Sequence, residues 1–533
     1  MTRPIEPTPA AVRDAIARGD LEGAAKALAD VIASDRHADW AFINLISLLA
    51  NHGKRADAIV VARRAIVANP GNAAAHDQLG TLLSWENDLP AGEWHFRRAL
   101  ESGGTNAGPL ANLALNLMQQ GRTTESEAAF AEADRLAPKT LRILAHWSKL
   151  REVHGDFAGA ERLLEAAEAA SSAEAINLLR VEYLARTGRD AEALAIIEAA
   201  RNINGRGQLE RGRLYERVGR HVEAWADYVE GKRKLAAELG DLGYDATGVA
   251  AFYRAMREYF SATTMARIPR ATTRGDVPQP VFILGAPRSG TTLIEQVLSA
   301  HSAVRAGGEH AWLSELRAVA QRLCSYGGDF PGCLDATAAA DERHLAAVLR
   351  DHYFARAETA GLTAPGARLF TDKTPFNEIN LPLLIMAFPQ AKLVLVKRDP
   401  RDVAVSMFSN NLSHGFNCAY RIEDIVRHLA ATESLLADYQ RELGFAAHVL
   451  QYERFVADAE TETRRLLEHV GLPFEDACLR FHESRRYAPT PSYAQVAEKV
   501  NDRSIGRWRH FARELAPHVA ALGPVREAGG YAP

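Results

Sequence analysis

Six turn-forming residues recur along the first half of the chain at a nearly constant interval. The positions are Gly53, Asn87, Gly121, Gly155, Gly188 and Gly219. Successive positions differ by 34, 34, 34, 33 and 31 residues. A period of about 34 residues is typical of tetratricopeptide repeats, in which each unit is a hairpin of two helices. One hairpin cannot bury its own apolar face, so the interval predicts a stacked all-α solenoid.

Small side chains support the repeat interpretation. Ala58 and Ala193 follow their turns by five residues, where a small side chain lets neighbouring helices approach, and Gly92 and Ser126 replace Ala in two units. A fragmentary unit around Gly19 precedes the others, so the predicted count is six or seven. The groove of such a solenoid binds a peptide or a partner protein, or else the solenoid only covers or dimerises the rest of the chain. The sequence leaves both alternatives open.

A chain of 533 residues is too long for one hydrophobic core. We expect the repeat solenoid over residues 1–237 and a second domain over residues 279–533. Between them, residues 238–278 read as a capping helix at 245–260 followed by a linker rich in Pro, Thr and Gly.

The second domain opens with a buried strand, a glycine loop and a helix, in the stretch VFILGAPRSGTTLIEQVLSA from Val281 to Ala300. Free N–H groups of such a loop and the helix N-terminus form a concave, positive site for a phosphate. The donor-rich residues of the loop and helix start are Arg288, Ser289, Gly290, Thr291 and Thr292. The alternative is a tight turn that binds no ligand.

The glycine spacing matches a nucleotide-binding P-loop, but Thr291 stands where a nucleoside triphosphatase carries Lys. The cation is inside the loop instead, at Arg288. This favours a shorter phosphate chain bound without a metal ion over the magnesium nucleotide of a kinase. A nucleotide kinase on the same core remains a further alternative.

Four more short apolar segments, at 302–306, 368–370, 392–397 and 448–451, read as strands that alternate with helices. This order predicts a multidomain protein whose second domain is an α/β, P-loop-like fold with a parallel sheet. Ligands of such sheets bind at the carboxyl ends of the strands. Polar clusters follow these segments at Glu309, Lys373, Arg398 and Tyr452, which predicts one active site at that edge.

The sequence PRSGTT after a buried strand resembles the 5′-phosphosulfate loop of sulfotransferases. The resemblance is to the branch with tyrosylprotein sulfotransferases and bacterial tetratricopeptide-repeat sulfotransferases. It implies 3′-phosphoadenosine 5′-phosphosulfate (PAPS) as co-substrate, no metal ion, and transfer of a sulfuryl group to an acceptor hydroxyl. An enzyme of this kind is the function we expect, with a catalytically inert interaction scaffold as the alternative.

The donor also carries a 3′-phosphate, which calls for Arg and a hydroxyl. The segment RDPRDVAVS resembles the 3′-phosphate element of the family and implies that role for Arg398 and Ser406. A surface ion pair of Arg398 with a neighbouring aspartate is the alternative. The resemblance also places Tyr452 near the nucleotide and Ser504, in SIGRW, in the segment that closes over the 3′-phosphate. Asn410 departs from the family, whose protein-sulfating members carry a basic residue there.

Catalysis requires a base for the acceptor proton and cations for the leaving phosphate. Glu309, in AGGEHAW, occupies the place of the family's base, and the adjacent His310 is the rival. The resemblance implies that Lys373 hydrogen-bonds the bridging oxygen and that Arg288 neutralises the phosphosulfate. Otherwise Glu309 is a helix-start charge and Lys373 a solvated loop residue.

Composition excludes several functional classes. The net charge of −4 gives no general attraction to nucleic acid, and no apolar run reaches the roughly 20 residues that a membrane span needs. The N-terminus lacks the apolar core of a signal peptide, and the four cysteines are scattered, so we expect a cytoplasmic protein. The acceptor stays open among protein tyrosine, saccharide, lipid and small phenol. The repeats slightly favour a protein or peptide.

Overall fold

The computed structural model describes residues 10–18, 20–169, 173–238, 243–324, 328–338, 343–412, 416–483 and 499–531. The chain divides into two compact units, residues 1–180 and 181–533. Most of the repeat helices lie in the first unit, and the last ones belong to the second. The division at 237 and 278 expected from the sequence stays a prediction.

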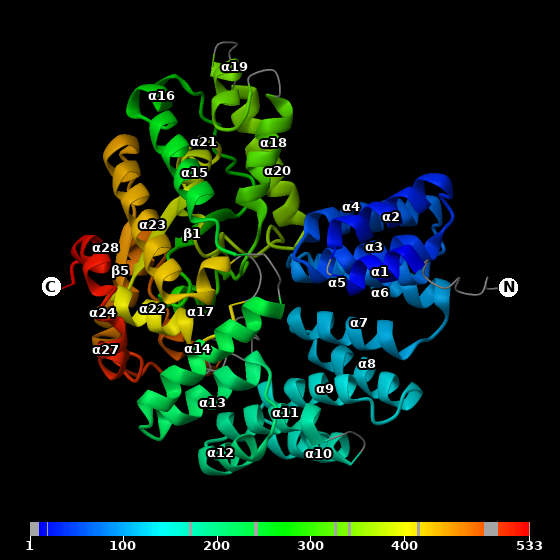
Figure 1. The fold of residues 1–533 in the computed structure, drawn as a ribbon. Coiled ribbons are helices and arrows are strands. Elements are labelled where there is room, and N and C mark those ends of the chain that lie inside the picture. The colour runs from blue at the N-terminus through cyan, green and yellow to red at the C-terminus, as the bar shows by residue number, and fades with distance from the viewer. Residues whose placement is uncertain are drawn as a thin grey trace. The chain divides into compact units, whose positions relative to one another are not determined.

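The first half consists of helices in successive pairs (Figure 1). The helices are α1 (Ala10–Ala17), α2 (Leu21–Ser34), α3 (Asp39–Asn51), α4 (Arg55–Ala68), α5 (Ala73–Trp85), α6 (Leu89–Gly103), α7 (Ala107–Gln119), α8 (Thr123–Leu136), α9 (Leu141–Val153), α10 (Phe157–Glu168), α11 (Ala173–Arg186), α12 (Asp190–Ala199), α13 (Gly205–Arg217) and α14 (His221–Glu238). All six predicted turn residues lie between the two helices of a pair. Their φ angles run from 60° at Asn87 to 80° at Gly219, in the left-handed region that favours Gly and Asn. The tetratricopeptide-like repeat is therefore confirmed; Gly19 lies outside the described residues.

The small residues of the repeats are buried where helices meet. Ala58 and Ala193 have no exposed surface. Ser126 is equally buried, and its hydroxyl donates to the Ala114 carbonyl at 2.7 Å. A Cβ on Gly92 would lie 2.5 Å from the Ser84 hydroxyl oxygen. The two departures from Ala thus fit their local contacts.

The second unit contains a five-stranded parallel sheet with strand order β2-β3-β1-β4-β5. The strands are β1 (Gln279–Leu284), β2 (Val304–Arg305), β3 (Leu369–Asp372), β4 (Lys392–Lys397) and β5 (His448–Gln451). Every predicted strand is present, and the α/β class is confirmed. β2 is shorter than expected, and β3 runs on to include Thr371 and Asp372. Because β1 is central, the loop after it opens between the ends of β3 and β4.

Helices cover both faces of the sheet. Phe282 and Leu284 pack into one apolar cluster, while Val281 and Ile283 pack into another on the opposite face, as expected of a strand buried on both sides. The helices of this domain include α15 (Ala246–Tyr259), α16 (Ala262–Arg267), α17 (Thr291–Ser299), α18 (Trp312–Leu323), α20 (Arg343–Thr359), α21 (Leu381–Ala387), α22 (Pro400–Phe408), α23 (Ile422–Leu443), α24 (Tyr452–Ala457), α25 (Ala459–Val470) and α28 (Gly523–Ala528). The predicted capping helix is α15, and its Met256 packs into the first cluster.

The last repeat hairpin, α13–α14, packs on the sheet domain within the second unit. Tyr228 of α14 joins an apolar cluster with Phe408 of α22 and Phe511 near the C-terminus. Trp225 lies 5.1 Å from Phe408, measured between ring centroids. This contact brings repeat residues close to the helix that carries Ser406.

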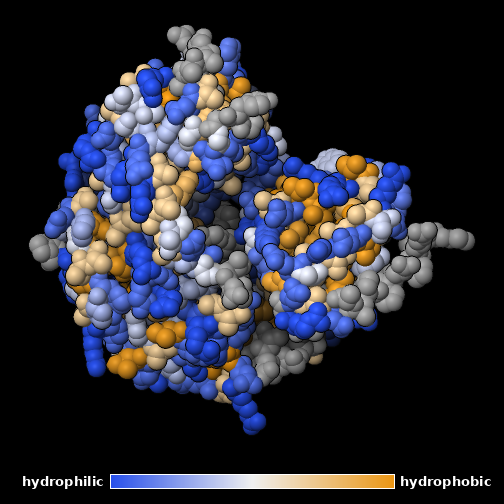
Figure 2. Space-filling view, turned by 45° about the horizontal axis from the view of Figure 1, so that its top comes forward, coloured by the Kyte–Doolittle hydropathy of each residue, from blue (hydrophilic) through white to orange (hydrophobic). Residues whose placement is uncertain are grey.

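Hydrophilic and hydrophobic side chains are interspersed on the face shown in Figure 2. Within the described ranges, every helix is too short or too polar to cross a lipid bilayer.

Candidate active site

The loop after β1 adopts the strained backbone that its glycines allow. Gly285 has φ of 154° and Gly290 of 107°, and Arg288 between them also has a positive φ, 69°. A Cβ on Gly285 would lie 2.8 Å from the Val396 carbonyl oxygen, and one on Gly290 would lie 2.7 Å from the Tyr452 ring. The loop is therefore pressed against the end of β4 and the start of α24. Such strain is found where function requires it.

Helix α17 starts directly after the loop, with Gly290 as its N-cap and Thr291 and Thr292 as its first, buried residues. As a glycine, the N-cap residue Gly290 has no side chain with which to cap this N-terminus. The first N–H groups of a helix lack intrahelical acceptors and favour an anion. Ser289 lies beside them, 2% exposed, and its hydroxyl makes no hydrogen bond to the described residues.

The second predicted anion element contacts the loop directly. The Arg288 Nε donates to the Ser406 hydroxyl at 3.0 Å. Arg398, at the end of β4, donates from Nη1 to the Arg288 carbonyl at 2.9 Å. Arg288 thus meets Arg398 and Ser406, which lie 110 and 118 positions further along the chain, at the carboxyl edge of the sheet. The prediction that Arg398 and Ser406 bind the same donor as the loop requires these residues to lie close to it.

Arg398 is not used in a surface ion pair with either neighbouring aspartate. Asp399 binds Arg401, and both Asp402 carboxylate oxygens accept backbone N–H groups, at 2.7 and 2.8 Å. Arg398 instead lies over the Tyr452 ring, 4.9 Å from its centroid, and donates to the Ser504 carbonyl. Tyr452 and Ser504 therefore both lie beside the predicted anion site.

Positive charge accumulates around Arg288. Burial, followed by the charges of Arg398, Arg507 and Arg213, lowers the pKa of Arg288 to about 9. A nearby anion would reverse this effect, because opposite charge favours the ionised guanidinium. The Arg398 Nε is buried and makes no hydrogen bond to the described residues. The arrangement fits a polyanionic ligand.

Two of the three predicted catalytic residues, Glu309 and Lys373, form an ion pair with each other. Lys373 Nζ contacts Glu309 Oε1, although the residues are 64 positions apart. The Lys373 side chain is 1% exposed, whereas the Glu309 side chain is 40% exposed. Three residues after Lys373, the Phe376 N–H donates to the Gly285 carbonyl at 3.4 Å, which links this segment to the loop.

Buried groups behind this pair hold its backbone in place. Glu295 of α17 accepts hydrogen bonds from the Gly308 N–H at 2.8 Å and the Thr371 hydroxyl at 2.7 Å. Asp372 accepts from Tyr353 at 2.8 Å, and burial raises its pKa to about 7. The segments that carry Glu309 and Lys373 are thereby fixed to α17 and β3.

His310, the rival base, is 3% exposed, and its ring stacks on Trp312 with centroids 3.6 Å apart. Burial lowers the pKa of His310 to about 3. A buried, stacked imidazole is poorly placed to reach an acceptor, whereas Glu309 is partly open to solvent.

Residues 280–476 match the model of the sulfotransferase family. An uncharacterized protein of Aquifex aeolicus is 32% identical over 248 residues, which make up 46% of this chain and 32% of that protein. The match thus spans about a third of the length of that relative. Protein-tyrosine sulfotransferase 1 of Danio rerio is 29% identical over 267 residues, 48% of this chain and 72% of the relative.

The C-terminal region belongs to the sulfotransferase family. Among solved structures, the sulfotransferase domain of the Synechococcus PCC 7002 olefin synthase aligns with a TM-score of 0.31 and 19% identity, over 45% of this chain and 90% of that domain. The family resemblance drawn from PRSGTT is confirmed.

Asp402 is a residue of the sulfotransferase domain that the sequence reasoning did not single out. Its carboxylate binds the backbone N–H groups of Gly506 and Trp508, so it attaches the C-terminal segment to α22. Its place in the first turn of a helix favours an acidic residue for local reasons alone. The sequence RDPRD therefore does not predict that Asp402 binds the backbone of Gly506 and Trp508.

Proposed function

We propose that the protein is a PAPS-dependent O-sulfotransferase. Membership of residues 280–476 in the sulfotransferase family supports sulfuryl transfer. The observation that carries the proposal is the direct contact of the two anion elements, Arg288 with Ser406 at 3.0 Å and Arg398 with Arg288 at 2.9 Å. A ligand with phosphates at both ends of an adenosine requires two such elements side by side.

The residues present fit this donor. For the 5′-phosphosulfate, the loop offers the Ser289 hydroxyl and the Arg288 guanidinium. The start of α17 adds the backbone N–H groups of Thr291 and Thr292. Arg398 and Ser406 would hold the 3′-phosphate, with Tyr452 and Ser504 beside them. Charge-assisted hydrogen bonds between a guanidinium and a phosphate are stronger than hydrogen bonds between neutral groups.

When bound, PAPS supplies a sulfuryl group attached to a phosphate leaving group. Glu309 would remove the proton of the acceptor hydroxyl as that oxygen bonds to sulfur and the bond between sulfur and the bridging oxygen breaks. Lys373 would hydrogen-bond the bridging oxygen and stabilise the departing charge. Their ion pair gives both groups fixed positions.

The acceptor that we propose is a tyrosine hydroxyl in a protein or peptide, and the repeats would recruit it. The relatives named protein-tyrosine sulfotransferases support this choice. A region of stacked helical hairpins is also better suited to bind an extended peptide than to bind a small phenol.

The direct test is to incubate the full chain with isotopically labelled PAPS and a panel of acceptors. The panel contains a tyrosine peptide, the same peptide with Phe in place of Tyr, a small phenol, a saccharide and a lipid. Label on the tyrosine peptide alone supports the proposal. Label on another acceptor would correct the acceptor, and no transfer together with no donor binding would leave the scaffold alternative.

A further inference from the structure

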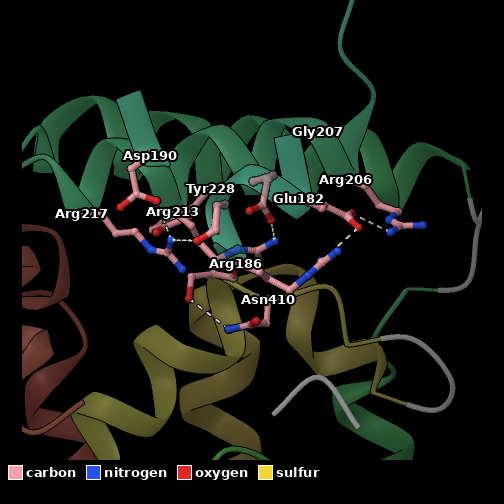
Figure 3. A network of polar contacts seen from close by, with 12 residues as sticks. Glu182, Arg186, Asp190, Arg206, Gly207, Arg213, Arg217, Tyr228 and Asn410 are labelled. Carbon is pink, nitrogen blue, oxygen red and sulfur yellow. Dashed lines mark hydrogen bonds and ion pairs between the residues drawn. The ribbon is translucent and has the colours of Figure 1, made fainter. Parts of the chain in front are cut away.

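The last repeat hairpin reaches the end of the helix that carries Ser406 (Figure 3). Arg213 of α13 donates from Nη1 to the Ser409 carbonyl at 3.1 Å. Lys232 of α14 is 1% exposed and donates to the carbonyls of Asn410 at 2.7 Å and Met407 at 3.3 Å. The last carbonyls of a helix lack intrahelical donors and carry partial negative charge, so two repeat residues complete the C-terminus of α22.

Position 410 supplies no charge of its own. The Asn410 Nδ2 turns back and donates to the Ser406 carbonyl at 2.8 Å. The side-chain donors at this end of α22 therefore come from Arg213 and Lys232 of the repeat hairpin and from Arg507 near the C-terminus.

Arg507 is bound on one edge by a repeat residue. Its Nε and Nη2 donate to the two carboxylate oxygens of Glu216 of α13, at 2.5 and 2.6 Å, and its Nη2 also donates to the Ser409 hydroxyl at 2.8 Å. Its contacts with the described residues use Nε and Nη2 and leave Nη1. A guanidinium held in this fork has a fixed plane, with the donors of Nη1 left for another anion.

Glu216 is itself held in place. The Tyr228 hydroxyl donates to its Oε2 at 2.6 Å, and Tyr228 has no exposed surface. The chain of contacts thus runs from the buried interior of the repeat hairpin through Glu216 to Arg507, whose charge acts on Arg288 in the phosphate loop.

We propose that Glu216 is a positioning residue for the donor, holding the Arg507 guanidinium so that its Nη1 completes the 3′-phosphate site with Arg398 and Ser406. The last repeat hairpin is then part of the donor site as well as of the solenoid. This inference rests on the proposed function, because it assigns a 3′-phosphate to the site. Without Glu216, Arg507 regains rotamer freedom that donor binding must remove, and affinity for the 3′-phosphate falls.

The test is calorimetric titration of the full chain with adenosine 3′,5′-bisphosphate and with adenosine 5′-monophosphate. We expect Glu216→Ala to weaken bisphosphate binding about tenfold and to leave monophosphate binding within about twofold. Tyr228→Phe removes the hydroxyl that donates to Glu216 and also accepts from Arg507 Nη2 at 3.5 Å, so it should act in the same direction by a smaller factor. The matched control is Glu223→Ala, which removes a surface carboxylate of the same hairpin, 3.0 Å from Arg220, and should change neither affinity.

Three results would overturn the inference: unchanged bisphosphate affinity in Glu216→Ala, tighter bisphosphate binding, or an equal loss for both nucleotides. Tighter binding would mean that Glu216 competes with the phosphate for Arg507. If Glu216→Ala does not fold, Tyr228→Phe decides between the same outcomes. A wild-type protein that does not prefer the bisphosphate would instead refute the proposed donor, independently of Glu216.

Discussion

Replacing Glu309 by Gln tests the proposed base with little change in shape. The amide keeps the size of the carboxylate and can still accept a hydrogen bond from Lys373, but it cannot take a proton. Loss of a general base lowers rates by about 10²–10⁴-fold. At about 1.4 kcal/mol for each factor of ten, this is roughly 3–5 kcal/mol of transition-state stabilisation.

The fold should tolerate this change. The Glu309 side chain is 40% exposed, so water screens its charge, and the Gln amide oxygen can still accept a hydrogen bond from the buried Lys373 ammonium. We therefore expect kcat to fall while the dissociation constant for adenosine 3′,5′-bisphosphate and the melting temperature stay close to wild type.

The assay is transfer of labelled sulfuryl group to the best acceptor of the wild type, alongside calorimetry. Glu315→Gln on α18 removes a carboxylate of similar exposure that lies beside Arg356, and it serves as the matched control. Transfer by Glu309→Gln within about threefold of wild type would refute the assignment, since the expected loss is at least about 10²-fold. A rate that His310→Phe abolishes and Glu309→Gln spares would identify His310 as the base.

Three further substitutions have defined outcomes. Lys373→Met should lower kcat by about 10²–10³-fold with unchanged bisphosphate affinity, measured by transfer and calorimetry; unchanged kcat would exclude the leaving-group role. Gly290→Ala, whose Cβ meets the Tyr452 ring, should destabilise the fold by about 1–3 kcal/mol in urea unfolding, whereas Gly275→Ala, with open space around it, should not. Burial raises the pKa of Asp372, so between pH 4 and 7 the folded state holds a proton that the unfolded state releases, and stability falls as pH rises. Between pH 5 and 8, the free energy of unfolding of Asp372→Asn should therefore fall less than that of the wild type. An equal fall would contradict a raised pKa of the buried Asp372 carboxyl.

The sequence predicted those parts of the fold that depend on local signals. The repeat turns need a residue that tolerates positive φ, and Gly53 through Gly219 are spaced by the length of one hairpin. The strands were visible as short apolar runs, and the loop residues Gly285 and Gly290 have positive φ angles, which glycine adopts readily. Strand ends were less predictable, because Thr371 and Asp372 are polar yet continue β3.

The contacts that the sequence could not predict join distant segments through polar side chains. Glu216 and Arg507 are 291 positions apart, and nothing in the local pattern of α13 distinguishes Glu216 from a solvated helix carboxylate. The same holds for Lys232, a charged helix residue that is buried and donates to the Met407 carbonyl of α22. Periodicity reveals which faces are apolar, whereas the pairing of individual charges depends on how the elements pack.

The central claim is that two anion elements at neighbouring strand ends hold the two ends of one nucleotide. Calorimetry of the full chain with adenosine 3′,5′-bisphosphate, adenosine 5′-monophosphate and adenosine 3′-monophosphate tests it most directly. Since a hydrogen bond to a charged group contributes about 1.5–3 kcal/mol, the bisphosphate should bind at least about tenfold more tightly than either monophosphate, and Arg398→Met should remove that advantage. Equal affinity for all three ligands, or no binding of the bisphosphate at millimolar concentration, would contradict the account.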